Sequence, residues 1–245
     1  MGRPAGFMNI RALATDYDGT IAWHGTVPES TCEALEAFKA SGRTLLLVTG
    51  RELHDLFSVF EYSKLFDLMV MENGAVIYDP HTKENEVLAP AVPKAFVDRL
   101  REEGVRQLSV GHAIVGTQQT YQGVIEEVIQ EMGLELQIIL NKGALMVLPA
   151  GVDKASGLRA ALARLGISPA EVIGVGDAEN DFGFLELCGC SAAVDNALPA
   201  LKERVKCVTR GSRGAGVEEL IQKVLREDGE TTPALSGKCG NDGTG

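Results

Sequence analysis

The sequence has no long apolar run and few cysteines. No stretch approaches the roughly 18 consecutive apolar residues that a transmembrane helix needs, and positions 1–9 have no apolar core of the length found in signal peptides. The five cysteines are odd in number and include no CxxC pair. A disulfide framework or a structural zinc site is therefore not expected, and we predict a cytoplasmic protein in a reducing compartment.

Positive charge is also in short supply. The chain carries 34 acidic residues against 23 Lys and Arg, a net charge of −11. This balance argues against nucleic acid or an anionic membrane as the main partner. A small anionic substrate remains compatible, because a bound cation can reverse the field inside a pocket. The composition leaves the oligomeric state open.

What the chain does contain is a regular alternation of strand and helix patterns. Its 245 residues, 45% of them hydrophobic, suffice for one large α/β domain or for a core with a smaller added domain. Apolar runs separated by helical periodicity are typical of a parallel sheet with right-handed crossovers. The runs are predicted as strands at 10–14, 44–48, 68–71, 76–78 and 172–175, and the main helices at 28–41, 52–60 and 154–165.

A polar, turn-rich segment at 79–84 interrupts this alternation. We therefore predict a Rossmann-like parallel-sheet core with helices on both faces, at 8–80 and 150–227, and a small inserted α/β cap at 81–149. The Gly-, Thr- and Ser-rich end, 228–245, is predicted to be a disordered tail or linker. Within the cap we expect helices at 94–103 and 121–132 and strands at 106–115, 135–140 and 144–148.

Polar side chains follow several of the predicted core strands. Parallel strands place their carboxyl ends at one edge of the sheet, where α/β folds build their sites, so these side chains can meet. Aspartate and glycine are also ordinary turn residues, so no single position decides the matter. The residues concerned are Asp16 and Asp18 after the first strand, Thr49 after the second, Asp177 and Asp181 after strand 172–175, and Lys154 at a helix start.

This set of groups predicts phosphoryl chemistry. Two carboxylates about 5 Å apart repel by roughly 3 kcal/mol at an effective dielectric constant near 20, so a cation is expected among them. Oxygen ligands favour Mg²⁺, which commonly works with a substrate phosphate. The Lys154 ammonium and the Thr49 hydroxyl suit phosphoryl oxygens. An ionised Asp16 can attack phosphorus, and Asp18 can move the proton of the leaving oxygen.

In these residues the chain resembles the haloacid dehalogenase-like hydrolases. Four motifs match in order, and the resemblance extends over roughly residues 10–226. The insertion between the second and third motifs resembles subgroup IIB, with its α/β cap, which includes Cof-type, phosphoglycolate and sucrose-phosphate phosphatases; Asn73 and Asp195-Asn196-Ala197 resemble it too. The four motifs are Thr15-Asp16-Tyr17-Asp18-Gly19-Thr20, Leu47-Val48-Thr49-Gly50-Arg51, Gly151-Val152-Asp153-Lys154 and Gly176-Asp177-Ala178-Glu179-Asn180-Asp181.

The resemblance implies a role for each motif residue. Asp16 would be the nucleophile, and Asp18 would be the acid/base. The expected Mg²⁺ ligands are Asp16, Asp18 through its backbone carbonyl, Asp177 and Asp181, the last directly or through water. Substrate binding is implied for Thr49, Gly50, Arg51, Lys154 and Asn73.

The predicted function is a Mg²⁺-dependent phosphatase acting on a small phosphomonoester, either a sugar phosphate or a phosphoglycolate-like compound, through an aspartyl-phosphate. One alternative is a phosphotransferase or mutase on the same fold. Another is a phospho-aspartate signalling module, although receiver domains are about half this length and have no cap. The turn residues Asn141 and Lys142 can either face the substrate or form a plain solvated turn.

Overall fold

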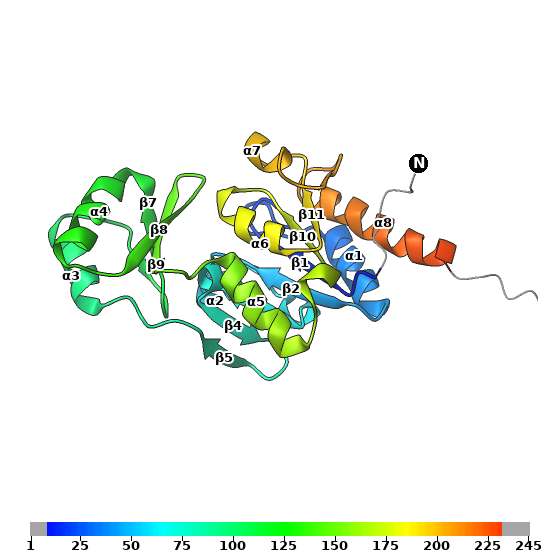
Figure 1. The fold of residues 1–245 in the computed structure, drawn as a ribbon, viewed down its shortest axis with the longest axis horizontal. Coiled ribbons are helices and arrows are strands. Elements are labelled where there is room, and N and C mark those ends of the chain that lie inside the picture. Colours follow the sequence, from blue (N-terminus) through cyan, green and yellow to red (C-terminus); the bar gives the residue numbers. More distant parts are fainter. Residues whose placement is uncertain (1–8, 232–245) are drawn as a thin grey trace, which may run out of the picture.

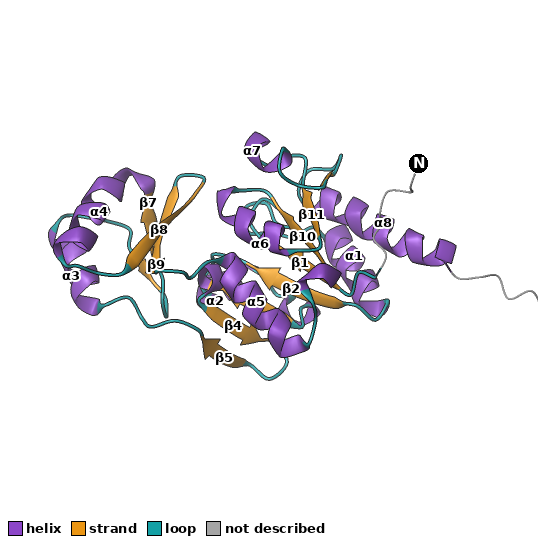
Figure 2. Ribbon diagram, viewed as in Figure 1, coloured by secondary structure: helices purple, strands orange, loops and turns teal. Residues whose placement is uncertain are grey.

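The computed structural model describes residues 9–231, which form two β-sheets with their covering helices (Figure 1). The first strand and the last strand of the described chain both belong to the larger sheet. The chain enters the smaller sheet at positions 88–93 and returns to the larger one at positions 150–153. The fold is therefore an α/β core with a second, smaller layer of sheet and helices (Figure 2).

The larger sheet has eight strands in the order β12-β11-β10-β1-β2-β3-β4-β5. Neighbouring strands from β12 to β3 pair in parallel. At the other edge, the pairs β3–β4 and β4–β5 are antiparallel. Its strands are β1 (Ala12–Thr15), β2 (Thr44–Val48), β3 (Leu68–Met71), β4 (Val76–Asp79), β5 (Glu84–Val87), β10 (Val172–Gly176), β11 (Cys190–Ala193) and β12 (Cys207–Val208).

The central strands are buried because helices cover the sheet. Every residue of β1, β3 and β10 is buried, as expected for the inner strands of a parallel sheet. One helix layer packs α1 against α8 and β2, and another packs α5 against α6, β3 and β4. These helices are α1 (Glu29–Ala40), α2 (Leu53–Val59), α5 (Lys154–Leu165), α6 (Phe182–Leu187), α7 (Pro199–Lys202) and α8 (Gly214–Thr231).

The smaller sheet is antiparallel and has its own apolar core. Along β9 the side chains alternate between two environments, as strand geometry requires. Leu145 and Val147 pack with the cap helices, whereas Met146 and Leu148 belong to the main core cluster. The strands, in the order β6-β7-β9-β8, are β6 (Ser109–Val110), β7 (Val115–Gln118), β8 (Leu136–Asn141) and β9 (Ala144–Pro149), and the helices are α3 (Lys94–Glu102) and α4 (Gln122–Glu131).

Several predicted elements differ from the observed ones. The expected strand 106–115 is wrong: a loop at Gly111–Ile114 separates β6 from β7, because its backbone turns to donate hydrogen bonds to Glu72. Strand β5 was not predicted, since its mostly polar residues lie at an exposed sheet edge. Helix α8 continues to Thr231, four residues into the predicted tail. The remainder of that tail, with Cys239, lies outside the described residues.

None of the helices within residues 9–231 combines the length and the apolar character that crossing a membrane requires.

Candidate active site

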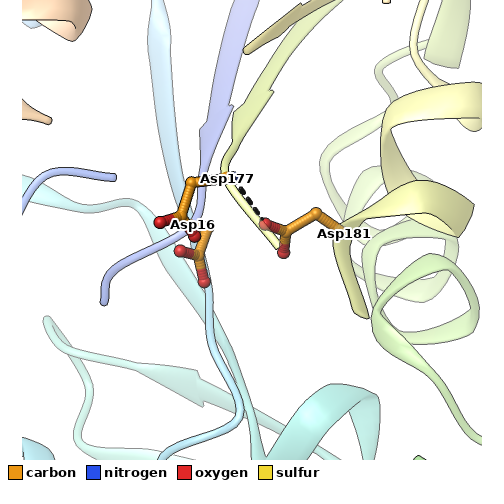
Figure 3. A group of neighbouring side chains, drawn as sticks. All are labelled: Asp16, Asp177 and Asp181. Atoms are coloured by element: carbon orange, nitrogen blue, oxygen red, sulfur yellow. Dashed lines mark hydrogen bonds between the residues drawn. The ribbon is translucent and has the colours of Figure 1, made fainter. Parts of the chain in front are cut away.

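Three carboxylates meet at the carboxyl edge of the larger sheet (Figure 3). Thr15 pairs with Val175, so the residues that follow β1 and β10 emerge side by side. These are Asp16, whose backbone N–H still donates to the Val175 carbonyl at 3.0 Å, and Asp177. Asp181 closes the group from the 3-10 turn that precedes α6. One oxygen from each of the three carboxylates lies within 4.8 Å of the others.

Asp181 is held rigidly by its own loop. Its Oδ2 accepts the backbone N–H groups of Asp177 at 2.8 Å and Ala178 at 3.0 Å. The side chain is fully buried. Its other oxygen, Oδ1, faces Lys154 and the rest of the acidic group. The two backbone hydrogen bonds to Oδ2 therefore fix the direction in which Oδ1 points.

A buried ammonium bridges two of these carboxylates. Lys154 is the first residue of α5, which begins with a capping box between Asp153 and Ser156. Its Nζ donates to Asp16 Oδ1 at 2.6 Å and to Asp181 Oδ1 at 2.7 Å, and the side chain is 1% exposed. Burial acts to lower the pKa of Lys154, but the charges of Asp16 and Asp181 outweigh burial and raise it. Lys154 is therefore a permanent cation of the site.

Two ammonium groups, Lys154 and Lys142 of the smaller sheet, do not compensate three carboxylates. Burial, reinforced by the neighbouring Asp181, raises the pKa of Asp16 to about 7, even though Lys154 opposes the shift. Burial likewise raises the pKa of Asp177. The Oδ1 atom of Asp177 is buried and has no hydrogen-bond partner among residues 9–231. Excess negative charge and an unpartnered carboxylate oxygen suit a divalent cation with oxygen ligands.

The turn after β1 approaches this group closely. Gly19 has a φ of +84°, and a Cβ built on it would lie 2.0 Å from Asp177 Oδ2, so only glycine is accommodated there. The Thr20 hydroxyl donates to Asp16 Oδ2 at 2.9 Å. Because Lys154 occupies the other Asp16 oxygen, both oxygens of this carboxylate are oriented by donors.

Asp18 lies apart from the acidic group. Its carboxylate accepts a fork of hydrogen bonds from Arg51, with Nε at 2.6 Å and Nη2 at 2.8 Å. The side chain is 44% exposed and lines the main cavity. The Asp18 carboxylate is thus not part of the acidic group, and any contact with a metal there must come from its backbone, as the motif implied. Arg51 is engaged by Asp18 and Asp55, and the hydrogen bonds that its guanidinium donates to Asp18 raise the pKa of Arg51.

Thr49 and Asn73 form a second polar wall. Thr49 is 1% exposed, and its carbonyl accepts the Asn73 backbone N–H at 3.0 Å. Asn73 has a φ of 55°, and its Oδ1 accepts from Asn180 at 3.2 Å. The Nδ2 of Asn73 is buried without a hydrogen-bond partner in the described part of the chain. Gly50 lies close to Asn73, since a Cβ built on it would lie 3.7 Å from Asn73 Oδ1.

The smaller sheet closes over the site. Lys142, in the turn between β8 and β9, places its Nζ against Asp177 Oδ2 in an ion pair. On the other side of the junction, the buried Glu72 carboxylate accepts the backbone N–H groups of His112 and Ala113 and contacts His112 Nδ1 at 2.8 Å. Both contacts join the smaller sheet to the edge that carries the acidic group.

A cavity of about 570 Å³ opens between the two sheets. Its floor includes Asp16, Asp18, Thr49 and Gly50, so it leads directly to the acidic group. The side contributed by the smaller sheet combines uncharged polar residues with apolar ones, which include Ile114, Leu145 and Met146. That side includes the amide and hydroxyl residues Gln107, Ser109, Thr117, Gln118 and Asn141.

The structure thus brings most of the predicted residues together. Three further residues have contacts that sequence reasoning did not assign: Glu72, Thr20 and Asn196. Thr20 and Asn196 lie within quoted motifs, and Glu72 directly precedes Asn73. Their partners are distant in the chain or set by a turn, so only their position in or beside the motifs could have drawn attention to them. Asn196 donates to Gly19 and Asp177.

Comparison with known proteins gives a consistent result. A sequence profile of the haloacid dehalogenase-like hydrolase family matches residues 13–127 and 99–221. A phosphoglycolate phosphatase of Methanobrevibacter smithii is 28% identical over 233 residues, covering 89% of this chain and all of the relative. A phosphoglycolate phosphatase of Pyrobaculum aerophilum is 30% identical over 227 residues, covering 89% and 97%.

Among solved structures, a sugar phosphatase of haloacid dehalogenase subclass IIB superimposes with a TM-score of 0.70. It is 21% identical, and the alignment covers 89% of this chain and 99% of that one. This likeness concerns the fold, including the second sheet inserted into the core.

Proposed function

The chain belongs to the haloacid dehalogenase-like hydrolases, and we propose that it is a Mg²⁺-dependent phosphatase that hydrolyses a small organic phosphomonoester through an aspartyl-phosphate on Asp16. The observation that carries the proposal is the position of Lys154. Its buried ammonium joins Asp16 to Asp181 beside the unpartnered Oδ1 of Asp177, at the floor of a cavity. The names of the relatives support the same reaction class.

The residues present fit a magnesium ion. Asp16, Asp177 and Asp181 offer carboxylate oxygens close together. By its motif position, Asp18 would add its backbone carbonyl. Mg²⁺ would supply positive charge to offset the carboxylates and the phosphoryl oxygens. This neutralisation matters for Asp16, because its raised pKa leaves a substantial fraction protonated near neutral pH without a cation.

Asp16 is oriented for attack on phosphorus. Hydrogen bonds from Lys154 and Thr20 hold its two oxygens, which reduces the reorganisation needed before reaction. As the Asp16–phosphorus bond forms, the bond from phosphorus to the ester oxygen breaks, and Asp18 gives that oxygen a proton. Asp18 then accepts a proton from a water molecule. That water attacks phosphorus, releases phosphate and regenerates Asp16.

The phosphoryl group would be held by Thr49, Gly50 and Lys154. The Nδ2 of Asn73, which has no hydrogen-bond partner among residues 9–231, is a further donor next to Thr49. Arg51 would act chiefly through Asp18, because its guanidinium is already committed to that carboxylate. These roles rest on the motif positions together with the contacts described above.

The leaving group would occupy the cavity between the sheets. Amide and hydroxyl groups line the side from the smaller sheet, and these suit sugar hydroxyls. The Lys142 ammonium, which reaches Asp177 from the turn of the smaller sheet, suits a carboxylate, as in phosphoglycolate. Both substrate classes therefore belong to the proposal, which names no nucleic-acid or membrane partner.

We further propose that residues 81–149 act as a cap over a core formed by 8–80 and 150–227. Strand β5 is an exception, because it lies in the cap range but pairs with β4 of the larger sheet. Within residues 9–231, Cys32, Cys188, Cys190 and Cys207 are free thiols, which supports a reducing, cytoplasmic location.

The test is release of phosphate by the purified full-length protein. We expect turnover of an aryl phosphate with Mg²⁺, and loss of turnover in excess chelator and in Asp16→Asn. Phosphoglycolate, hexose phosphates and disaccharide phosphates are then compared by kcat/KM. Full activity of Asp16→Asn, or of the chelated protein, contradicts the proposal. Preferential transfer to a sugar acceptor over water would show a phosphotransferase instead.

A further inference from the structure

The loop that follows β11 makes hydrogen bonds to Asp177. The backbone N–H of Leu198 donates to the Asp177 carbonyl at 3.0 Å. The Nδ2 of Asn196 donates to the Gly19 carbonyl at 2.8 Å and to Asp177 Oδ2 at 3.3 Å. One amide group therefore joins the turn after β1 to the carboxylate after β10.

The orientation of the Asn196 amide is determined by backbone partners whose roles are unambiguous. Its Oδ1 accepts the Arg213 backbone N–H at 2.7 Å, and a backbone N–H can only donate. Its Nδ2 faces the Gly19 carbonyl, which can only accept. Reversing the amide would break both hydrogen bonds. The group that meets Asp177 Oδ2 is consequently a donor.

Arg213 is itself held in place. Its backbone has a φ of 54°, and its guanidinium lies 3.7 Å from the centre of the Trp23 ring. Trp23 belongs to the short hairpin that continues the turn after β1, where it bridges Thr26. The loop before α8, Asn196 and the turn after β1 thus form one connected support around Asp177.

The support acts on one oxygen of Asp177 only. Oδ2 is contacted by Asn196 and Lys142, whereas Oδ1 is buried without a partner among residues 9–231. We propose that Asn196 is a positioning residue, which holds Asp177 Oδ2 so that Oδ1 is presented to the divalent cation. This inference rests on the proposed function for the identity of the cation. It assigns to Asn196 a role that neither the metal ligands nor the phosphoryl-binding residues fill.

The proposal predicts an effect on metal affinity that a purely structural role would not have. Groups that orient metal ligands typically change metal affinity by 10–100-fold when they are removed. For Asn196→Ala we expect the dissociation constant of Mg²⁺ to rise about tenfold or more. The Mg²⁺ concentration for half-maximal rate should rise by the same factor, and kcat at saturating Mg²⁺ should recover toward the wild-type value.

The experiment is calorimetric titration of Mg²⁺ into the full-length protein, after treatment with chelator and dialysis. Asn85→Ala, at an exposed position in β5, is the matched control and should bind Mg²⁺ like the wild type. Circular dichroism establishes that each variant is folded. If Asn196→Ala does not fold, Asn196→Ser is measured instead, because its shorter side chain cannot span both acceptors.

Wild-type Mg²⁺ affinity in the folded Asn196 variant overturns the proposal. This failure is distinct from failure of the proposed function, which would show as absence of phosphatase activity in the wild-type protein whatever its Mg²⁺ affinity.

Discussion

Lys142 and Asp177 form an ion pair that joins the turn of the smaller sheet to the acidic edge of the larger one. The Lys142 side chain is 41% exposed, whereas Asp177 is buried. An exposed ammonium thus reaches a carboxylate of the site from the cap side. Lys142 and a divalent cation would place positive charge on the two oxygens of one carboxylate, so each should weaken the binding of the other.

Replacing Lys142 should therefore strengthen Mg²⁺ binding. For Lys142→Met we expect the Mg²⁺ dissociation constant to fall about threefold, equivalent to roughly 0.6 kcal/mol for a partly exposed charge. Calorimetry at constant ionic strength measures the change. Lys83→Met, in an exposed turn with a similar positive φ, is the control. Unchanged or weaker binding in Lys142→Met would show that the two cations do not compete.

Asp18 should matter most for poor leaving groups. A general acid is needed when the departing oxygen is basic, and general acid catalysis typically contributes 10²–10⁴-fold. For Asp18→Asn we expect kcat on an alkyl phosphate to fall about 100-fold or more, with a much smaller loss on a nitrophenyl phosphate. Steady-state kinetics on the two substrates gives the comparison. Equal losses on both would argue that Asp18 acts through Arg51 or the turn backbone and not as an acid.

The raised pKa of Asp16 predicts a pH-dependent stability of the metal-free protein. Between its ordinary value of 3.8 and about 7, the folded state keeps a proton that the unfolded chain has released. The contribution of this group to the free energy of unfolding therefore falls as pH rises through this range and is level above it. In chelator, we expect the Tm of Asp16→Asn to exceed that of the wild type near pH 8 and the difference to shrink toward pH 5.

Thermal unfolding followed by circular dichroism across this pH range tests the point. Asp195→Asn, at a half-exposed position, corrects for the loss of an ordinary carboxylate. A Tm difference that does not vary with pH would contradict the raised pKa.

Glu72 should control how firmly the cap loop is attached. Its carboxylate accepts two backbone N–H groups and contacts the His112 ring. Glu72→Gln replaces one acceptor oxygen by a donor, which should destabilise the loop by about 1–3 kcal/mol. Hydrogen exchange should then be faster at the His112 and Ala113 amides and unchanged in β10. Glu86→Gln, on an exposed edge strand, should leave both regions unaffected.

Much of the core could be predicted because its signals are local. The apolar runs predicted at 10–14, 44–48 and 172–175 form the strands β1, β2 and β10. The polar residues that follow these strands emerge at one edge of the sheet. The cap was less predictable. Segment 106–115 has β-prone residues, but the hydrogen bonds of His112 and Ala113 to Glu72 interrupt it with a loop. Glu72 lies 40 residues before His112 in the chain, so no local pattern indicates this contact.

The fold class and the family could be read from the sequence, because they follow from the periodicity of apolar residues and from motif order. The same motif order predicted the groups to which we assign the chemistry. Only the tertiary structure shows which carboxylate oxygens of the site accept hydrogen bonds and which do not. That Lys154 joins Asp16 to Asp181, that Arg51 holds Asp18 and that Asn196 leaves one oxygen of Asp177 free depends on how loops far apart in the chain approach one another. Such contacts are set by the packing of the whole sheet edge, and no local pattern of residues encodes them.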